Sequence, residues 1–177
     1  MGAGDEIPKS LTEMGYDVSI ISPDAISPEK LKPFQVVITG IRAYNTLKTL
    51  AFKQSILFDF VKEGHTMIVQ YNTTGDLVTK EIAPFPLKLS RDRVTDENAE
   101  VTFLEPNHSI LNYPNKITKK DFEGWKQEQG LYYPSEWDAA FTPIISANDQ
   151  GESAKKGALL VAKFGKGHYI YTGLSFF

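Results

Sequence analysis

One stretch, FQVVITGIRAYN at positions 34–45, constrains the fold of this chain more than any other. Its residues 36–38 are β-branched and continuously apolar, which is typical of a strand buried on both faces of a parallel sheet. Gly40 follows where such a strand ends, and polar residues come directly after it. Ligands of open α/β sheets bind at this carboxyl edge. The stretch therefore predicts an α/β domain with a polar site at the end of its central strand.

The composition excludes several classes of protein. With 177 residues, 41% of them apolar and 23% charged, the chain is long enough for one substantial core in a single domain. A net charge of −3 without a basic cluster argues against a nucleic-acid partner. No apolar run approaches the roughly 20 residues that span a bilayer. Because the chain has no cysteine, disulfides, zinc–thiolate sites and a cysteine nucleophile are excluded.

The periodicity of the apolar residues predicts an α/β first half. A helix is expected over Ile7–Met14, a strand over Asp17–Ile21, a helix over Leu47–Glu63 and a strand over His65–Gln70. Strand, helix and strand with short links imply a right-handed parallel crossover. The glycine-rich start resembles a strand-to-helix turn without its strand, and the chain stops after its last expected strand with no closing helix. We therefore expect a fragment that lacks the first strand and the last helix.

The second half has a different pattern. Positions 76–143 mix six prolines with both tryptophans, which predicts a long, ordered but irregular insertion. Three antiparallel strands are expected after it, the last two joined by a glycine-bearing hairpin. They lie at 142–147, 158–164 and 168–173.

Polar side chains follow two of the expected parallel strands. Adjacent parallel strands bring these side chains to one carboxyl edge, where they suit a ligand rich in hydroxyl or amide groups. The alternative is that they cap backbone groups of helices and loops. The candidates are Arg42, Tyr44, Asn45, Gln70 and Asn72.

The densest polar run is SRDRVTDEN at positions 90–98. Arg91 or Arg93 could bind a carboxylate, a phosphate or sugar hydroxyls, with Asp92 or Asp96 orienting the guanidinium group. The alternative is a salt-bridge network that pins the insertion to the sheet.

Aromatic and histidine side chains offer further candidates. Trp125 and Trp137 could stack on sugar rings, but core packing of the insertion is the favoured interpretation. A cysteine-free hydrolase that uses Asp92 or Asp96 with His108 or His168 stays an alternative function.

Several stretches together resemble a known family. They are GAGDEIP, FQVVITGIRAYN, IVQYNT, PLKLSRDRVTDENA, FLEPNHSILNYPNKIT, DFEGWKQEQGLYYPSEWD and GKGHYIYTGLSFF. The chain is similar to the C-terminal domain of bacterial PIG-L (LmbE-like) deacetylase-family proteins. This resemblance implies a flavodoxin-like, class I glutamine amidotransferase-like three-layer α/β sandwich, with a mostly parallel sheet and antiparallel C-terminal strands.

The resemblance also implies a function. The family's deacetylase chemistry belongs to a separate N-terminal domain that binds zinc through a His-Pro-Asp-Asp motif, and this chain lacks the motif. We therefore expect a non-catalytic accessory domain that binds carbohydrate or helps assembly, with no cofactor of its own. Its expected partner is the parent's deacetylase domain. A purely structural or homodimerising module is the alternative. A bacterial, periplasmic parent is compatible with the resemblance, but the compartment stays open.

Overall fold

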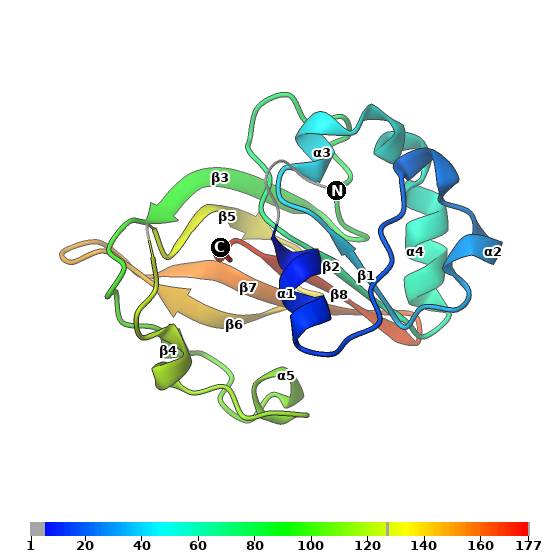
Figure 1. Cartoon of the computed structure of the whole chain (residues 1–177). Coiled ribbons are helices and arrows are strands. Elements are labelled where there is room, and N and C mark those ends of the chain that lie inside the picture. Colours follow the sequence, from blue (N-terminus) through cyan, green and yellow to red (C-terminus); the bar gives the residue numbers. More distant parts are fainter. Residues whose placement is uncertain (1–5, 127, 177) are drawn as a thin grey trace.

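A computed structural model describes residues 6–126 and 128–176 of the chain, and its centre is a mixed β-sheet (Figure 1). The sheet has six strands in the order β1-β2-β8-β7-β6-β4. These are β1 (Val36–Thr39), β2 (Thr66–Val69), β4 (Thr102–Phe103), β6 (Phe141–Ala147), β7 (Lys155–Phe164) and β8 (Gly167–Thr172). A second sheet pairs β3 (Leu87–Val94) with β5 (Gly130–Trp137). The helices are α1 (Ile7–Glu13), α2 (Pro28–Leu31), α3 (Ala43–Thr46), α4 (Gln54–Lys62) and α5 (Ser109–Asn112), with short 3-10 turns at Pro23–Ala25, Lys48–Phe52 and Lys119–Phe122.

The parallel part of the sheet consists of β1, β2 and β8. Helix α4 connects β1 to β2 and buries Leu57, Phe60 and Val61, which recur at helical spacing. Gly64 ends the helix with a φ of +122°, a conformation that favours glycine. Helices α1 to α4 lie around the β1–β2 side of the molecule (Figure 1).

The strands expected at the central run and at 65–70 and a helix between them are present, but the helix expected over Leu47–Glu63 is divided into a 3-10 turn at Lys48–Phe52 and α4. The central run was expected to be buried on both faces, but Val36 and Ile38 are 44% and 37% exposed.

The other half of the sheet is antiparallel, from β8 through β7 and β6 to β4. Gly165, with a φ of +61°, forms the tight turn between β7 and β8. A Cβ atom at Gly167 would lie 2.0 Å from the carbonyl oxygen of His65, so only glycine fits there. The hairpin therefore packs directly against the segment between α4 and β2.

The β3–β5 sheet lies against β7 of the main sheet. A Cβ atom at Gly157 of β7 would lie 2.5 Å from the carbonyl oxygen of Pro134 in β5, which measures how closely the two backbones approach. Figure 1 shows β3 and β5 running side by side past the antiparallel strands. Their ladder contains register shifts around Leu89 and Asp92. These irregularities belong to the site described below.

Two apolar clusters form the core. The larger joins α4 to the parallel strands and includes Tyr44, Tyr169 and Tyr171, all fully buried. The second fills the antiparallel half around Tyr133 and Ile144. Each Å² of apolar surface that is removed from water contributes about 25 cal/mol to the free energy of folding. The two clusters are therefore the main stabilising contribution to the fold.

The expected flavodoxin-like, class I glutamine amidotransferase-like three-layer sandwich with a mostly parallel sheet is wrong for this chain. Only β1–β2 and β2–β8 are parallel, whereas β8–β7, β7–β6 and β6–β4 are antiparallel. The helices of the described residues are few, and the longest, α4, has 9 residues. The sequence pattern predicts antiparallel strands in the C-terminal part, and β6, β7 and β8 pair in that way. The mostly parallel sheet was implied by the family resemblance, and the strand expected at residues 17–21 pairs with no strand of the described chain.

Two local expectations are corrected as well. Residues 17–21 form no strand, because no neighbouring strand of the described chain pairs with them. Positions 76–143 are not an irregular insertion throughout, because β3 and β5 form an antiparallel pair of 8 residues each within them. The charged side chains of β3 are exposed to solvent, so the strand lacks the apolar run by which the other strands were predicted. The single-domain organisation and the fragment ends stay predictions.

Candidate functional site

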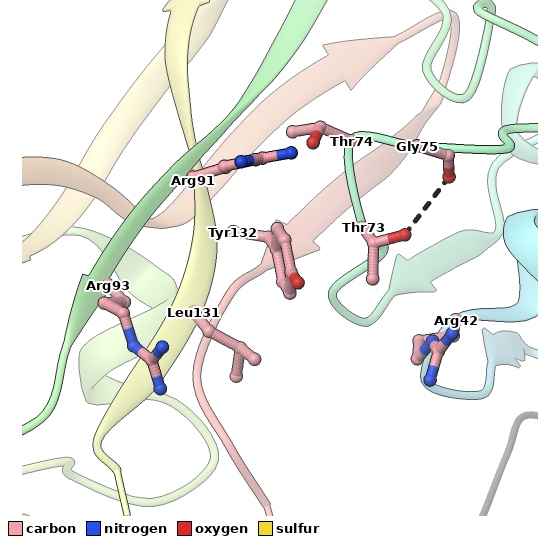
Figure 2. Close-up of a pocket in the computed structure, with 8 residues that line it drawn as sticks. All are labelled: Arg42, Thr73, Thr74, Gly75, Arg91, Arg93, Leu131 and Tyr132. Carbon is pink, nitrogen blue, oxygen red and sulfur yellow. Dashed lines mark hydrogen bonds between the residues drawn. The ribbon is translucent and has the colours of Figure 1, made fainter.

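The polar edge expected at the end of β1 is one wall of an open pocket of about 460 Å³ (Figure 2). Three parts of the chain form it: the start of α3, the loop after β2, and the β3–β5 pair. The lining residues are Arg42, Thr73, Thr74, Gly75, Arg91, Arg93, Leu131 and Tyr132. The structure thus brings three of the predicted ligand-binding residues, the arginines, to one site.

Arg42 sits on a strained backbone. Its φ is 54° and its ψ 22°, the left-handed conformation, which costs a non-glycine residue roughly 1–2 kcal/mol. Its backbone N–H donates a 2.8 Å hydrogen bond to the carbonyl oxygen of Tyr71 at the end of β2, which ties the start of α3 to the neighbouring strand. The side chain is exposed at the pocket wall (Figure 2).

Tyr132, on the opposite wall, also has a positive φ, of 52°. Its ring stacks near that of Tyr71, with centroids 6.4 Å apart and planes 20° from parallel. Its carbonyl oxygen accepts a 3.2 Å hydrogen bond from the buried hydroxyl of Tyr171. Figure 2 shows the ring standing in the middle of the pocket.

The strained residues gather at this site. The described residues contain three non-glycine residues with a positive φ, and the third, Asp76, directly follows the pocket residue Gly75. Such conformations persist only where the surrounding structure holds them, and they concentrate at functional sites. The strain therefore marks this pocket out from the rest of the surface.

A bulge in the β3–β5 ladder directs Arg91 into the pocket. The register passes from Leu89 directly to Asp92, which leaves Ser90 and Arg91 without paired residues. The Ser90 hydroxyl holds the bulge, because it donates to the carbonyl oxygen of Tyr133 at 2.8 Å and accepts from the N–H of Asp92 at 2.8 Å. Bulges commonly re-aim a side chain in this way.

Asn45 fixes the loop that forms the third wall. Its side-chain amide donates to the carbonyl oxygens of Thr73, at 3.2 Å, and Gly75, at 2.7 Å, and its oxygen accepts from the Thr73 N–H at 2.9 Å. The Thr73 hydroxyl also donates to Gly75, at 3.2 Å (Figure 2). Asn45 thus positions the loop rather than facing a ligand.

Three other predicted residues, Tyr44, Gln70 and Asn72, are buried beneath the pocket. The Asn72 side chain accepts from the Tyr44 N–H at 2.9 Å and donates to the Gln70 carbonyl at 2.9 Å. The Tyr44 hydroxyl donates to Gln54 at 2.7 Å, and burial raises the pKa of that hydroxyl well above its ordinary value. They form the polar base that supports the site.

The charge of the pocket is positive. No carboxylate is among its lining residues. Arg93 pairs with Glu128, but neither Arg42 nor Arg91 has an ion-pair partner within residues 6–126 and 128–176. An arginine without a carboxylate partner presents its donors to solvent or to an anionic ligand.

The predicted acidic partners lie outside the pocket lining. Asp92 and Asp96 are exposed, and Asp96 accepts a 2.8 Å hydrogen bond from the Asn98 N–H. A different carboxylate, Asp149, pins the end of β3, since it accepts from the N–H groups of Thr95 and Asp96 at 2.9 Å. Burial alone raises the pKa of Asp149, but these hydrogen bonds outweigh it and hold the pKa below its ordinary value.

Trp125 lies away from the pocket in an aromatic cluster. Its ring stacks on Phe122, with centroids 5.6 Å apart, and tilts against Phe176 at 5.9 Å. Trp125 therefore packs against other aromatic side chains, as the alternative of core packing expects.

Five of the pocket residues were not among the predicted candidates: Thr73, Thr74, Gly75, Leu131 and Tyr132. The first three follow directly on the candidate Asn72. The direction of Leu131 and Tyr132 depends on a bulge and a left-handed residue that the pattern LYYPSEW does not signal.

No catalytic constellation forms from the residues proposed for a hydrolase. His108 accepts the Ile110 N–H at 3.2 Å and so caps α5, while His168 lies at the start of β8. Within the described ranges, no hydrogen bond joins these histidines to Asp92 or Asp96. The same ranges hold no group of three or more His, Asp or Glu side chains that could bind a metal ion. None of their helices is both long and apolar enough to cross a bilayer.

No protein-family model matches the chain, and no curated protein sequence does. Solved structures with the same fold exist. A cold-adapted β-galactosidase from Rahnella sp. R3 matches 94% of the chain with a TM-score of 0.59 and 16% identity. A cytoplasmic protein of Salmonella typhimurium matches 93% with a TM-score of 0.58 and 14% identity. A second cytoplasmic protein, from strain LT2, matches 84% with a TM-score of 0.52 and 12% identity.

The chain spans 23% of the Rahnella enzyme, 72% of the first Salmonella protein and 64% of the second. Identities this low establish the likeness of fold alone. The part of the β-galactosidase that matches has the same fold as this chain. This likeness agrees with the finding that the chain is not a flavodoxin-like sandwich. The resemblance to the PIG-L family stays a prediction.

Proposed function

We propose that this chain is a ligand-binding accessory domain, and that its pocket holds an anionic carbohydrate such as a uronic acid. One observation carries the proposal: two arginines without carboxylate partners, Arg42 and Arg91, face an aromatic ring, Tyr132, across one open cavity. The three groups come from three separate segments. The three groups come together only because two residues adopt a strained backbone and β3 contains a bulge. Strain of this kind concentrates at functional sites.

The chemistry of the lining suits each part of such a sugar. The guanidinium groups can bind a carboxylate by charge-assisted hydrogen bonds, worth about 1.5–3 kcal/mol each. The hydroxyls of Thr73 and Thr74 can exchange hydrogen bonds with those of the sugar. The face of Tyr132 can pack against the apolar face of the ring. Each wall of the pocket therefore contributes a different contact.

Two further considerations point to carbohydrate. The resemblance to PIG-L proteins suggests a parent that deacetylates N-acetylated sugars with zinc in another domain. Independently, the Rahnella structure with the same fold is a β-galactosidase, an enzyme named for a sugar substrate. Both support an accessory role in a larger carbohydrate-active protein.

A thermal-shift screen tests the proposal. The probes are glucuronate and galacturonate, with galactose, N-acetylglucosamine and glucosamine as neutral and cationic comparisons. A ligand at 100 times its dissociation constant stabilises the fold by about 2.7 kcal/mol, which in a domain of this size raises the melting temperature by roughly 5–10 °C. Only the uronates are expected to do so.

The matched variants are Arg91→Gln and Lys88→Gln. Both replace an exposed cation on β3, but only Arg91 lines the pocket. The uronate shift should disappear in Arg91→Gln and persist in Lys88→Gln. A shift that both variants retain, or an equal response to glucosamine, would rule out the anionic-sugar site.

A second candidate is a module for domain assembly or for homodimerisation. Phe176 is 38% exposed, and β1 pairs on one side only within the described residues, so both are places where apolar contacts with another domain can form. The parent's catalytic domain is the partner that the family resemblance suggests. This candidate does not exclude ligand binding, because the pocket and the β1 edge are different surfaces.

A further inference from the structure

The third arginine of the pocket differs from the other two in its electrostatic surroundings. Arg93 lines the pocket together with Arg42 and Arg91 (Figure 2), but its guanidinium group forms an ion pair with the carboxylate of Glu128. Among the ion pairs within residues 6–126 and 128–176, this pair alone involves a pocket-lining residue. Glu128 therefore offsets one of the three positive charges that the lining carries.

The position of Glu128 is fixed by the residue that follows it. Gln129 is fully buried, its backbone N–H donates to the carbonyl oxygen of Val94 at 2.9 Å, and its side-chain amide donates to that of Ala99 at 2.7 Å. Val94 directly follows Arg93, so these hydrogen bonds hold Glu128 close to Arg93. Backbone hydrogen bonds join the two segments here, and their pairing therefore does not depend on the ion pair.

The carboxylate of Glu128 is more buried than that of a comparable ion pair. The side chain of Glu128 is 22% exposed, whereas that of Glu136, which pairs with Lys88 across the same two strands, is 69% exposed. Water and salt screen a partly buried charge less than an exposed one. The negative charge of Glu128 therefore acts strongly on the part of the pocket that Arg93 lines.

The ion pair divides the pocket into a free and an occupied part. Arg42 and Arg91 have no ion-pair partner within the described ranges, so their donors can bind the carboxylate of one uronic acid. A second carboxylate could bind Arg93 only by displacing Glu128, and it would then lie close to that negative charge. Like charges placed together in a binding site repel, which weakens binding. One anionic group can therefore bind without a competing charge, and a second cannot.

We infer that Glu128 is a specificity-determining residue, which limits the pocket to sugars with one negative charge and disfavours sugars with two. The inference rests on the proposed function and narrows its class of ligand. Glu128 acts through Arg93, whose donors it occupies, and not by contact with the sugar. The alternative is a purely structural ion pair that pins β3 to the start of β5.

Calorimetric titrations of galacturonate and of digalacturonate test the inference. The two ligands share the uronic acid and carry one and two carboxylates. The native chain should bind digalacturonate no more than about threefold more tightly than galacturonate. Glu128→Gln keeps the shape of the side chain and removes its charge, so it should bind digalacturonate about tenfold more tightly than the native chain does. Its affinity for galacturonate should change by less than about threefold.

Glu136→Gln is the matched control. It also removes a carboxylate that pairs with a cation of β3, and it changes the net charge equally, but neither Glu136 nor Lys88 lines the pocket. Both affinities should stay at their native values in this variant. In the double variant Arg93→Gln/Glu128→Gln the gain for digalacturonate should be absent, because the arginine that would bind the second carboxylate is gone.

Several results would overturn the inference. One is an equal affinity for digalacturonate in the native chain and in Glu128→Gln, and another is the same gain in Glu136→Gln, because overall charge would then be the cause. Without any variant, a native chain that binds digalacturonate at least about tenfold more tightly than galacturonate would overturn it too. If the native chain binds neither ligand, the proposed function is wrong and the inference fails with it. If galacturonate binds but charge at position 128 has no effect, the inference alone is wrong.

Discussion

Arg42 and Tyr132 face each other across one pocket with nearly the same positive φ, 54° and 52°, and Tyr71 connects them. The Tyr71 carbonyl accepts the Arg42 N–H, and the Tyr71 ring stacks near that of Tyr132. The two strained positions are therefore parts of one arrangement. A displacement of Tyr71 would alter both walls of the site.

Replacing Arg42 with glycine should separate stability from function. Glycine adopts the left-handed conformation without strain, which offsets its entropic cost of about 0.5–1 kcal/mol. We expect Arg42→Gly to be as stable as the native chain or up to about 1 kcal/mol more stable in urea denaturation, while its uronate affinity falls. Arg42→Ala, which keeps the strain, is the control. A loss of more than about 1 kcal/mol in Arg42→Gly would show that the conformation is not strained.

Asn45→Ala should loosen the loop at Thr73–Gly75. Three hydrogen bonds to backbone groups are lost, which costs about 1–3 kcal/mol of unfolding free energy, and the uronate affinity should fall with the loop's order. Asn112→Ala is the matched control, since Asn112 also holds two backbone carbonyls, but at α5. If both variants lose stability while both keep full affinity, Asn45 has no positioning role.

The stability of the fold should depend on Asp149 at acidic pH. The pKa of Asp149 is depressed in the folded chain, so its contribution is present above the unfolded-state pKa of about 3.9 and is lost as the pH falls through the lower folded value. Because Asp149 is partly exposed, the contribution should be about 1 kcal/mol or less. Urea denaturation of the native chain and Asp149→Asn should differ at pH 7 and converge below pH 4. A constant difference down to pH 2 would contradict this.

Buried tyrosines should control stability at alkaline pH. Burial raises the pKa of the Tyr169 hydroxyl well above its ordinary value, so the folded chain keeps a proton that the unfolded chain releases above about pH 10. Stability therefore falls as the pH rises past 10, by up to about 1.4 kcal/mol per pH unit for each such group. Tyr169→Phe should reduce this slope in urea denaturation between pH 9 and 11.5. An unchanged slope would show that Tyr169 ionises without unfolding the chain.

Part of this structure follows from the sequence. The run at Val36–Ile38, the helix ended by Gly64 and the hairpin at Gly165 form where local patterns predict them, because each depends on short-range periodicity or on a glycine conformation. The antiparallel direction of β6, β7 and β8 was predicted, but the mostly parallel character of the whole sheet, which the family resemblance implied, is not found. Long-range pairing decides how many strands are parallel, and no local signal carries that information.

The candidate site could also be predicted only in part. Arg42 could be named as a ligand candidate because it follows a predicted strand, and Arg91 and Arg93 because they lie in the densest polar run of the sequence. Their meeting could not be foreseen, because it requires the bulge at Ser90 and the left-handed residue at Tyr132. Asn45 and Asn72 were also predicted to contact a ligand, but their side chains form hydrogen bonds to backbone groups instead.

The most direct test of the central claim is a calorimetric titration of galacturonate into the native chain and into Arg91→Gln, at low and at high salt. We expect binding to the native chain that weakens as salt rises, since the contact is between exposed charges, and at least tenfold weaker binding to Arg91→Gln at low salt. Equal affinities in the two proteins, or binding indifferent to salt, would contradict the assignment of this pocket to an anionic sugar.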